Sequence, residues 1–211
     1  MQHSFSEYLI CRNNYLDNPQ RVIELSSRQT YRKAEYYPGR RTENLLNLQD
    51  PDTKQFSVDF ADRLGYDVFP GIRNYSMSLF FHINEAANDP VLDQGWVHKD
   101  VSVLAGMVYL TLGENNFESG TSIFTGEGVE TTENKKVWND YNLTGIATEE
   151  YVSLVKYNHS QFKETIKVGN MFNRLVAYDS KLYHKPNRYS TAVGSPRLSL
   201  LFFISQFDYS N

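Results

Sequence analysis

The alternation of apolar and polar residues predicts that β-strands carry most of this chain. Residues 75–83 place a large apolar side chain at every second position, with mostly polar ones between, and a period of two is that of a strand. Residues 103–112 form a long apolar run with β-branched and aromatic members, which favours a buried strand. We expect further strands at residues 5–12, 121–124, 173–178 and 197–204.

Helix signals concentrate in the N-terminal third and in the middle of the chain. Asn18 is a good N-cap and is followed by a proline, which suits the first helical position and predicts a helix over residues 19–31. Aromatic and apolar residues recur every four positions in residues 52–65, which predicts a second helix that ends at a glycine. A third helix is expected over residues 148–162, where two glutamates in the first turn suit the helix dipole.

Three polar segments are expected to connect the predicted strands and helices. Residues 40–44 follow a Pro-Gly pair and are expected to be irregular, and residues 114–120 are expected to form a hairpin-like connection. Residues 126–145 are interpreted as a long surface excursion. Long loops of this kind are often functional, so the segment is either a lid over a site or an inserted loop without consequence.

Composition and charge narrow the class of protein. The chain has 211 residues, 40% of them apolar, and no linker or repeat, so we expect one mainly β domain over residues 1–211. The net charge of -4 makes a nucleic-acid partner an unfavoured hypothesis. With one cysteine, Cys11, the chain forms no intramolecular disulfide. Neither a signal peptide nor a membrane-spanning apolar run is recognisable, so we expect a cytoplasmic protein without a membrane partner.

The strongest chemical signal is the sequence Gly-Trp-Val-His98-Lys-Asp100. Alternate side chains of an extended strand point to the same face, so His98 and Asp100 would project together. One imidazole and one carboxylate supply two of the three ligands of a 2-His-1-carboxylate triad, which holds Fe(II) and leaves coordination positions open. The pair by itself is weak evidence, because His-x-Asp also occurs in ordinary polar loops.

Later segments supply a third ligand and an anchor. His184 follows a strand and a turn, and it is the best third ligand, ahead of His82 and Asp179. Arg197 and Ser199 lie one residue apart on the last strand and therefore share a face. A dicarboxylate such as 2-oxoglutarate can chelate Fe(II) through its keto-acid end. Its far carboxylate then suits the planar fork of an arginine, with a hydroxyl beside it.

The ordered pattern of His98-x-Asp100, His184 and Arg197-x-Ser199 resembles the Fe(II)- and 2-oxoglutarate-dependent oxygenase superfamily, and within it the prolyl-4-hydroxylase-like branch. Further segments are similar to that branch. They are Tyr109-Leu110, Gly120-Thr121 followed by Phe124, and the stretch 175–180 before the distal histidine. Two departures are Ser119, where the branch has a first glycine, and the long gap between His184 and Arg197.

The resemblance implies a double-stranded β-helix (jelly roll) with supporting N-terminal helices and the iron at the open end of the barrel. It implies that His98, Asp100 and His184 bind Fe(II) and that Arg197, Ser199 and Tyr109 bind 2-oxoglutarate. O2 is then the co-reactant, and 2-oxoglutarate is decarboxylated to succinate. Halogenating members lack the carboxylate ligand, so the presence of an aspartate favours a hydroxylase.

The substrate class stays open at this point. The branch suggests a peptidyl residue or an amino acid, and other branches act on small molecules or nucleobases. We expect residues 126–145 and 185–196 to frame the substrate mouth. Two other classes are an inert jelly-roll binding module and a cupin-type metalloenzyme that does not use 2-oxoglutarate.

Overall fold

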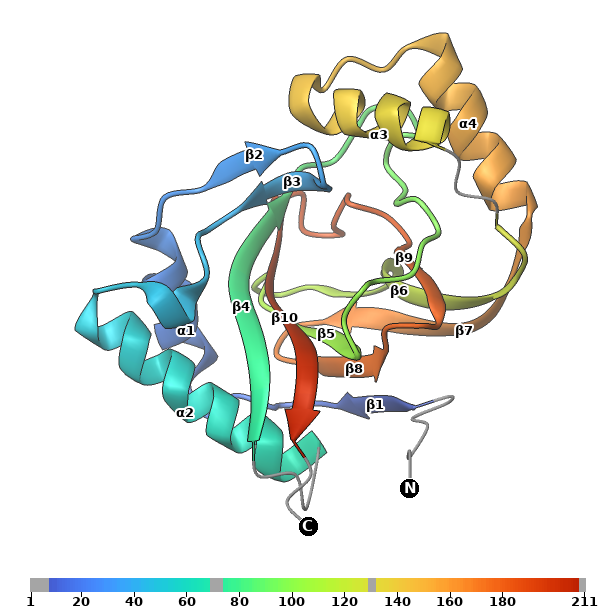
Figure 1. The fold of residues 1–211 in the computed structure, drawn as a ribbon. Coiled ribbons are helices and arrows are strands. Elements are labelled where there is room, and N and C mark those ends of the chain that lie inside the picture. The colour runs from blue at the N-terminus through green and yellow to red at the C-terminus, as the bar shows by residue number, and fades with distance from the viewer. Residues whose placement is uncertain (1–7, 69–73, 129–131, 209–211) are drawn as a thin grey trace.

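The chain is built on two antiparallel β-sheets (Figure 1). The computed structural model describes residues 8–68, 74–128 and 132–208. Within these residues the larger sheet has the order β1 (Leu9–Arg12), β8 (Leu175–Asp179), β5 (Leu104–Tyr109), β10 (Arg197–Asp208), β4 (Asn74–Asn84), β3 (Tyr37–Arg41) and β2 (Arg32–Ala34). The smaller sheet has the order β7 (Phe162–Met171), β6 (Asn115–Gly126) and β9 (Tyr183–Pro186). This is a jelly roll with supporting helices, which confirms the predicted fold class.

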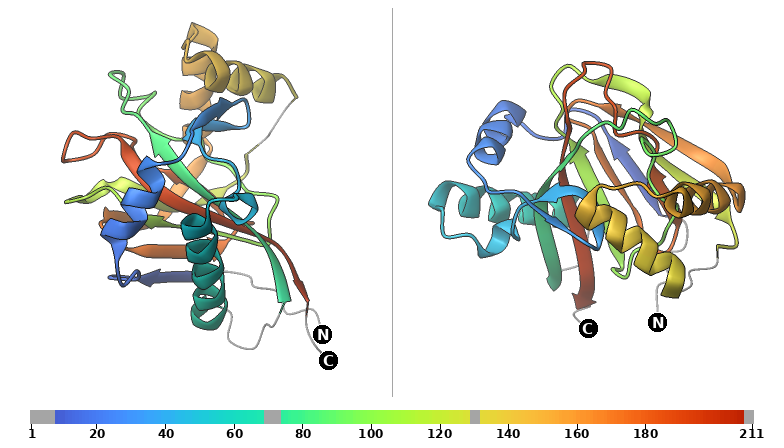
Figure 2. Two further views of the ribbon diagram at one scale, coloured as in Figure 1. Left: turned by 90° about the vertical axis from the view of Figure 1, so that its left-hand side faces the viewer. Right: turned by 90° about the horizontal axis from the view of Figure 1, so that it is seen from above.

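The outer face of the larger sheet is covered by helices α1 (Pro19–Ser27) and α2 (Pro51–Val68) and the short 3-10 helix η1 (Leu45–Asn47), as Figure 2 shows. Alternate residues of the strands point to this face and form the main core. Phe60 of α2 packs on Phe202 of β10, with ring centroids 6.1 Å apart. Burying a large apolar side chain contributes roughly 1.5–3 kcal/mol, so the helices are held mainly by this layer.

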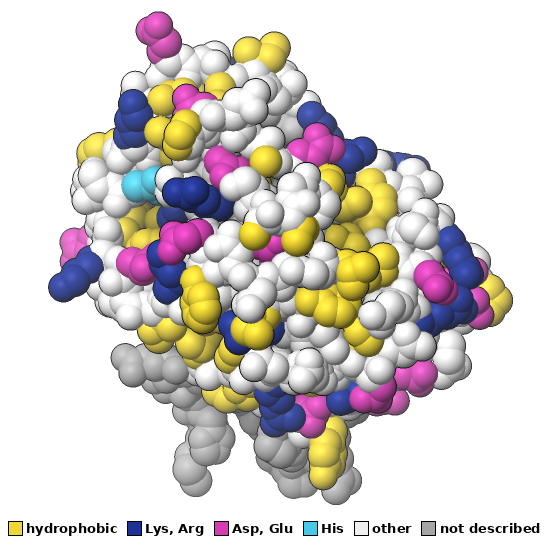
Figure 3. Space-filling view, turned by 180° about the vertical axis from the view of Figure 1, so that it is seen from behind, with side chains coloured by type: hydrophobic (Ala, Val, Ile, Leu, Met, Phe, Trp, Pro, Cys, Tyr) yellow, Lys and Arg dark blue, Asp and Glu magenta, His cyan; other side chains and the backbone are white. Residues whose placement is uncertain are grey.

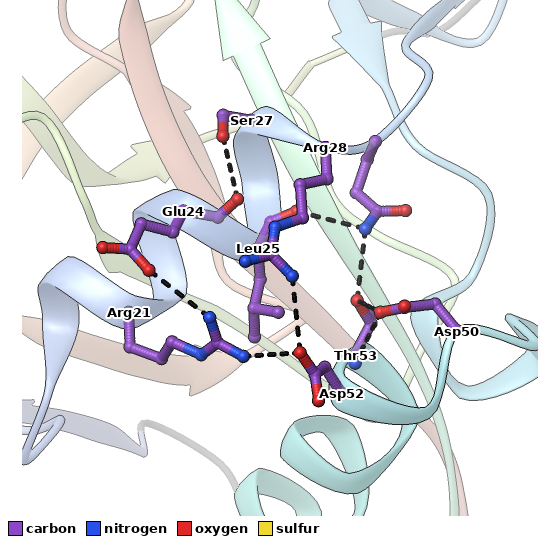
Figure 4. A network of polar contacts seen from close by, with 9 residues as sticks. Arg21, Glu24, Leu25, Ser27, Arg28, Asp50, Asp52 and Thr53 are labelled. Carbon is purple, nitrogen blue, oxygen red and sulfur yellow. Dashed lines mark hydrogen bonds and ion pairs between the residues drawn. The ribbon is translucent and has the colours of Figure 1, made fainter.

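Polar contacts fix the two helices to each other (Figure 4). Arg21 of α1 and Arg28, the C-cap residue of that helix, both pair with Asp52 in the first turn of α2, at 2.5 and 3.3 Å. Helix α1 ends at Ser27, earlier than predicted. Helix α2 instead continues past Gly65, where its end was predicted. A Cβ at that glycine would lie 3.0 Å from the Tyr75 ring, so the residue serves close packing.

The inner face of the larger sheet faces the smaller sheet. Apolar residues of β5 and β8 meet Ile123 of β6 and Val168 of β7 in a second, smaller core. Gly106 of β5 faces the other way, toward the helix-covered core, where the Phe202 ring and the backbone of β8 fill the space beside it, and a Cβ would come within 2.3 Å of Val176 O. The candidate functional residues lie on the inner face of the larger sheet and in the space between the two sheets.

Several strand predictions need correction. Residues 40 and 41 are not irregular, because β3 extends to Arg41 and pairs with β4, whereas residues 42–44 lie outside any helix or strand, as predicted. The short strand expected at residues 121–124 is part of the longer β6, which includes most of the expected connection at 114–120. Strand β7 was not predicted, because five consecutive residues of it are exposed and polarity there masks the period. Residues 5–7 of the first expected strand lie outside the described residues.

The segment 126–145 contains helix α3 (Thr132–Thr144), so the expected irregular excursion is wrong in that part. It lies beside α4 (Glu149–Ser160), whose N-cap is Thr148, the residue at which the helix was predicted to start. Tyr141 of α3 stacks on Tyr151 of α4, with ring centroids 4.0 Å apart. The two helices lie together at one end of the jelly roll, where α3 contacts β2 and β3 and α4 contacts β7 (Figure 1).

Charged side chains of both signs intermingle on the face seen in Figure 3, with apolar side chains between them. Such a mixed surface does not favour a long polyanion over other partners. None of the helices within the described residues has the length and apolar character needed to cross a membrane.

Candidate functional site

His98 and His184 are joined through their backbones. The His98 N–H donates to His184 O at 3.0 Å, and the His184 N–H donates to His98 O at 2.9 Å. This reciprocal pair fixes two segments that are far apart in sequence, and directly opposed residues of such a pair carry their side chains to the same side. The two imidazole rings accordingly lie with centroids 4.5 Å apart.

Both imidazoles are oriented in the same way. Nδ1 of His98 lies 2.8 Å from Trp96 O, and Nδ1 of His184 lies 2.9 Å from Leu182 O. A carbonyl oxygen only accepts hydrogen bonds, so each Nδ1 carries a proton, and Nε2 is the ring nitrogen left to bind a metal ion. Ligating histidines in metal sites are oriented by this kind of contact.

Asp100 completes the group. Its carboxylate oxygens lie 3.7 Å from His98 Nε2 and 3.3 Å from His184 Nε2. One ligand atom from each of the three residues lies within 4.8 Å of the other two. Burial would raise the pKa of this carboxyl, but the hydrogen bond to His184 and nearby positive charges lower it to about 2. The carboxylate is therefore ionised at neutral pH, as a metal ligand must be.

The rival ligands lie elsewhere. The ring of His82 is buried, and its Nε2 lies 2.6 Å from a backbone carbonyl of β3. Asp179 pairs with Leu104, whose side chain lies in the helix-covered core, so its carboxylate leaves the sheet on the outer face. Among the residues that the structure describes, the three predicted residues form the one group with the spacing of a metal site.

The expected anchor residues also come together. Ser199 of β10 lies opposite Tyr109 of β5 in the sheet, and Arg197 shares their face two residues away. The Arg197 guanidinium carbon lies 5.3 Å from the centre of the Tyr109 ring. The hydroxyl of Tyr109 lies 2.8 Å from that of Thr121 on the opposite sheet, a contact that the sequence did not indicate.

Arg197 is a buried cation with free donors. The residue is 2% exposed, and its Nε has no hydrogen-bond partner. Its Nη2 has only a weak contact, 3.6 Å from a methionine sulfur. No carboxylate lies within 4.0 Å of it among the described residues. Leaving a buried charged group unpaired is costly, so the donors suit an anionic ligand such as the far carboxylate of 2-oxoglutarate.

Helix α4 supports the site from behind, which the sequence analysis missed. Asn158 binds the backbone of Val97, directly before His98, and His159 donates from Nε2 to Gly95 O. His159 is therefore a half-buried supporting residue near the end of α4. No local signal identifies these contacts, since each spans more than sixty residues of sequence.

The two predicted mouth segments lie near the site in part. The ring centroid of Trp138 in α3 lies 6.3 Å from that of His98. In the loop before β10, Tyr189 is buried and lines a pocket of about 270 Å³ together with residues of β3, β4 and α3. Whether residues 126–145 act as a lid stays a prediction.

The fold is that of the Fe(II)- and 2-oxoglutarate-dependent oxygenases. A prolyl-4-hydroxylase from Pseudomonas putida superposes with a TM-score of 0.55 at 12% identity, over 95% of this chain and 94% of that one. HygX from Streptomyces hygroscopicus, solved with nickel and 2-oxoglutarate, gives 0.57 at 12% identity, over 97% and 87%. A Trichoplax adhaerens prolyl hydroxylase, solved with a hypoxia-inducible-factor peptide fragment, gives 0.55 at 10% identity, over 93% and 83%.

At these identities the likeness establishes the fold alone. By sequence, the chain belongs to a family of unknown function, DUF6445, whose model matches residues 3–204. No curated protein matches the sequence. The assignment of chemistry therefore depends on the site of this chain.

Proposed function

We propose that the chain is a non-heme Fe(II)- and 2-oxoglutarate-dependent dioxygenase that hydroxylates its substrate. The observation that carries the proposal is the meeting of three side chains, two from the segment before β5 and one from β9, with His98 and His184 presenting Nε2 toward Asp100. Two neutral imidazoles, one ionised carboxylate and an open side are the donor set of non-heme Fe(II) oxygenases.

In this proposal His98, Asp100 and His184 hold Fe(II), and Arg197, Ser199 and Tyr109 bind the far carboxylate of 2-oxoglutarate. When bound, the metal and cosubstrate supply O2-dependent oxidation: substrate C–H, 2-oxoglutarate and O2 give substrate C–OH, succinate and CO2. The buried, unpaired donors of Arg197 support the anchor role. A planar guanidinium gives a carboxylate two parallel hydrogen bonds and so fixes its direction.

The proposed substrate is a peptidyl residue, an amino acid or another small molecule. The two hydroxylases and HygX with this fold support a hydroxylase or related oxygenase, and one of them was solved with a peptide. The alternative classes are an inert binding module and a metalloenzyme that does not use 2-oxoglutarate. The complete ligand set argues against the first, and the unpaired cation of Arg197 argues against the second.

Turnover distinguishes these classes. We expect succinate to form from 2-oxoglutarate in the presence of Fe(II), ascorbate and O2, with stimulation by one member of a panel of amino acids, proline-containing peptides and nucleobases. Asp100→Asn should abolish succinate formation. Asp179→Asn is the matched control, because that carboxylate leaves the sheet on the other face.

Each alternative has its own outcome. No uptake of Fe(II) or Mn(II) in equilibrium dialysis would identify an inert module. Metal uptake with an oxidase activity that is unchanged in Arg197→Ala would identify a metalloenzyme that does not use 2-oxoglutarate.

A further inference from the structure

A second arginine points into the space between the sheets. Arg41 of β3 lies opposite His82 of β4, which in turn lies opposite Ser199 of β10. Directly paired residues of antiparallel strands share a face, so Arg41 faces the same side as the proposed cosubstrate anchor. Neighbouring strands are about 4.8 Å apart, which places Arg41 two strands, or about 10 Å, from Ser199 along the sheet.

The Arg41 guanidinium is held by aromatic rings. Its central carbon lies 4.0 Å from the Tyr37 ring centre and 5.5 Å from that of Phe203. Rings stack against the flat face of a guanidinium and leave its in-plane N–H donors unused. Nε of Arg41 is buried without a hydrogen-bond partner.

Its neighbours on the same hairpin have carboxylate partners, and Arg41 has none. Arg40 pairs with Glu85 at 2.5 Å, and Arg32 pairs with Glu43 at 3.4 Å. Within the described residues no carboxylate lies within 4.0 Å of Arg41. Burial lowers the pKa of Arg41 to about 10, against the opposing effect of Tyr37 and Asp100, so the side chain is still a cation at neutral pH.

The formal charges of the loaded site leave this cation uncompensated. Fe(II) and Arg197 together balance Asp100 and the two carboxylates of 2-oxoglutarate. His82, buried between Arg41 and Arg197, has its pKa lowered by burial and by both arginines, so it adds no charge. Among the described residues on the inner face of the larger sheet, Arg41 is then a positive charge without a balancing carboxylate, whereas Arg32 opposite it pairs with Glu43.

We propose that Arg41 binds an anionic group, a carboxylate or a phosphate, of the primary substrate. The proposal rests on the function proposed above and narrows its substrate class to small anionic molecules. The aromatic setting fits this class. Tyr37 and Phe203 border the guanidinium, and the mouth nearby carries Tyr141 and Tyr189 around the pocket described above.

Matched pairs of acids and neutral isosteres test the proposal. The protein is loaded with Zn(II) and 2-oxoglutarate, and binding of benzoate and benzamide, L-proline and L-prolinamide, and phenyl phosphate and phenol is measured by saturation-transfer NMR. We expect at least one anion to bind about tenfold or more tightly than its neutral partner. The carboxylate and phosphate arms distinguish the two sources of charge.

Variants locate the effect. Arg41→Gln should remove the preference for the anion, and Arg41→Lys should keep part of it. Arg28→Gln is the control, since Arg28 is exposed on α1 and pairs with Asp52 away from the sheets (Figure 4). Circular dichroism and thermal melting check that each variant is folded. Equal binding of acids and neutral partners, an unchanged preference in folded Arg41→Gln, or no anion binding at millimolar concentration overturns the proposal.

Measuring the 2-oxoglutarate affinity of the same variants distinguishes a failure of the Arg41 proposal from a failure of the proposed dioxygenase function. If the wild-type protein with metal does not bind 2-oxoglutarate, the proposed function fails. We expect Arg41→Gln to keep its 2-oxoglutarate affinity and Arg197→Gln to lose it. A loss in Arg41→Gln as large as in Arg197→Gln would assign Arg41 to the cosubstrate and overturn the substrate proposal alone.

Discussion

The side-chain amide of Asn158 forms hydrogen bonds with both backbone polar groups of Val97. Asn158 Nδ2 donates to Val97 O at 3.0 Å, and the Val97 N–H donates to Asn158 Oδ1 at 2.9 Å. Both residues are buried. The amide thus acts like a neighbouring strand for the residue before His98, and it couples helix α4 to the position of a proposed metal ligand.

Asn158→Ala should weaken both folding and metal binding. The substitution leaves a buried N–H and a buried C=O unpaired, and each such group costs about 1–3 kcal/mol. Loss of a group that orients a ligand lowers metal affinity by roughly 10–100-fold. Urea unfolding of the metal-free protein and Mn(II) titration measure the two effects. The control is Ser160→Ala, because Ser160 lies two residues later in the same helix and is exposed. An unchanged Mn(II) affinity in a folded Asn158→Ala would contradict the positioning role.

Tyr109 gives a prediction for cosubstrate binding. Its hydroxyl lies 2.8 Å from that of Thr121, its ring centre lies 5.3 Å from the Arg197 guanidinium carbon, and its backbone pairs with that of Ser199. If the hydroxyl also donates to 2-oxoglutarate, Tyr109→Phe should raise the 2-oxoglutarate Kd by about tenfold, the value of one charge-assisted hydrogen bond.

The variant Thr121→Val distinguishes a direct role of the Tyr109 hydroxyl in cosubstrate binding from a role in holding the two sheets together. It removes the same tyrosine contact but keeps the phenol, so it should raise the Kd much less than Tyr109→Phe. Isothermal titration of metal-loaded protein measures both variants. Equal effects would mean that the hydroxyl acts through structure alone.

Gly106→Ala should destabilise the fold. The added methyl would meet Phe202 Cζ and Val176 O at 2.3 Å, in a layer packed by helix α2. Overpacking of a core costs about 1–3 kcal/mol, and chemical denaturation should detect that loss. A change below about 0.5 kcal/mol, typical of an exposed site, would show that β5 can shift to admit the methyl.

His159 should make stability depend on pH. Burial, followed by the charge of Lys185, lowers its pKa from 6.5 to about 4, against the hydrogen bond to Gly95. The unfolded state then takes up a proton before the folded state does, so stability is complete above pH 6.5 and falls as the pH drops toward 4. Thermal melting across this range should show the decline, and it should be smaller in His159→Gln. A directly measured imidazole pKa near 6.5 in the folded protein would contradict this assignment.

The structure brings His98, Asp100 and His184 together. The sequence anticipated the first two because residues one apart on an extended segment share a face, and it offered His184 as the third from its place after a later strand and turn. The same rule set Arg197 beside Ser199. The position of Arg41 on the inner face was not predictable in this way, because residues 40–44 are polar and the pairing of β3 with β4 leaves no local signal in the sequence. The supporting contact from Asn158 was hidden for a similar reason, since it joins residues 61 positions apart.

Helix α3 and strand β7 were missed because both expose much polar surface, which weakens the hydrophobic period. The strands and helices of the main core were found because burial on one face imposes that period. The prediction that residues 1–211 form one domain, and that the protein is cytoplasmic, stays a prediction.

An anaerobic titration of Fe(II)-loaded protein with 2-oxoglutarate tests the central claim most directly. We predict one Fe(II) per chain and a weak visible charge-transfer band that appears on addition of 2-oxoglutarate. The band should be absent in Asp100→Asn and His98→Ala and retained in Asp179→Asn. Fe(II) binding without any band in the wild-type protein, or a band of equal strength in Asp100→Asn, would contradict the claim that these residues form a 2-oxoglutarate-dependent iron site.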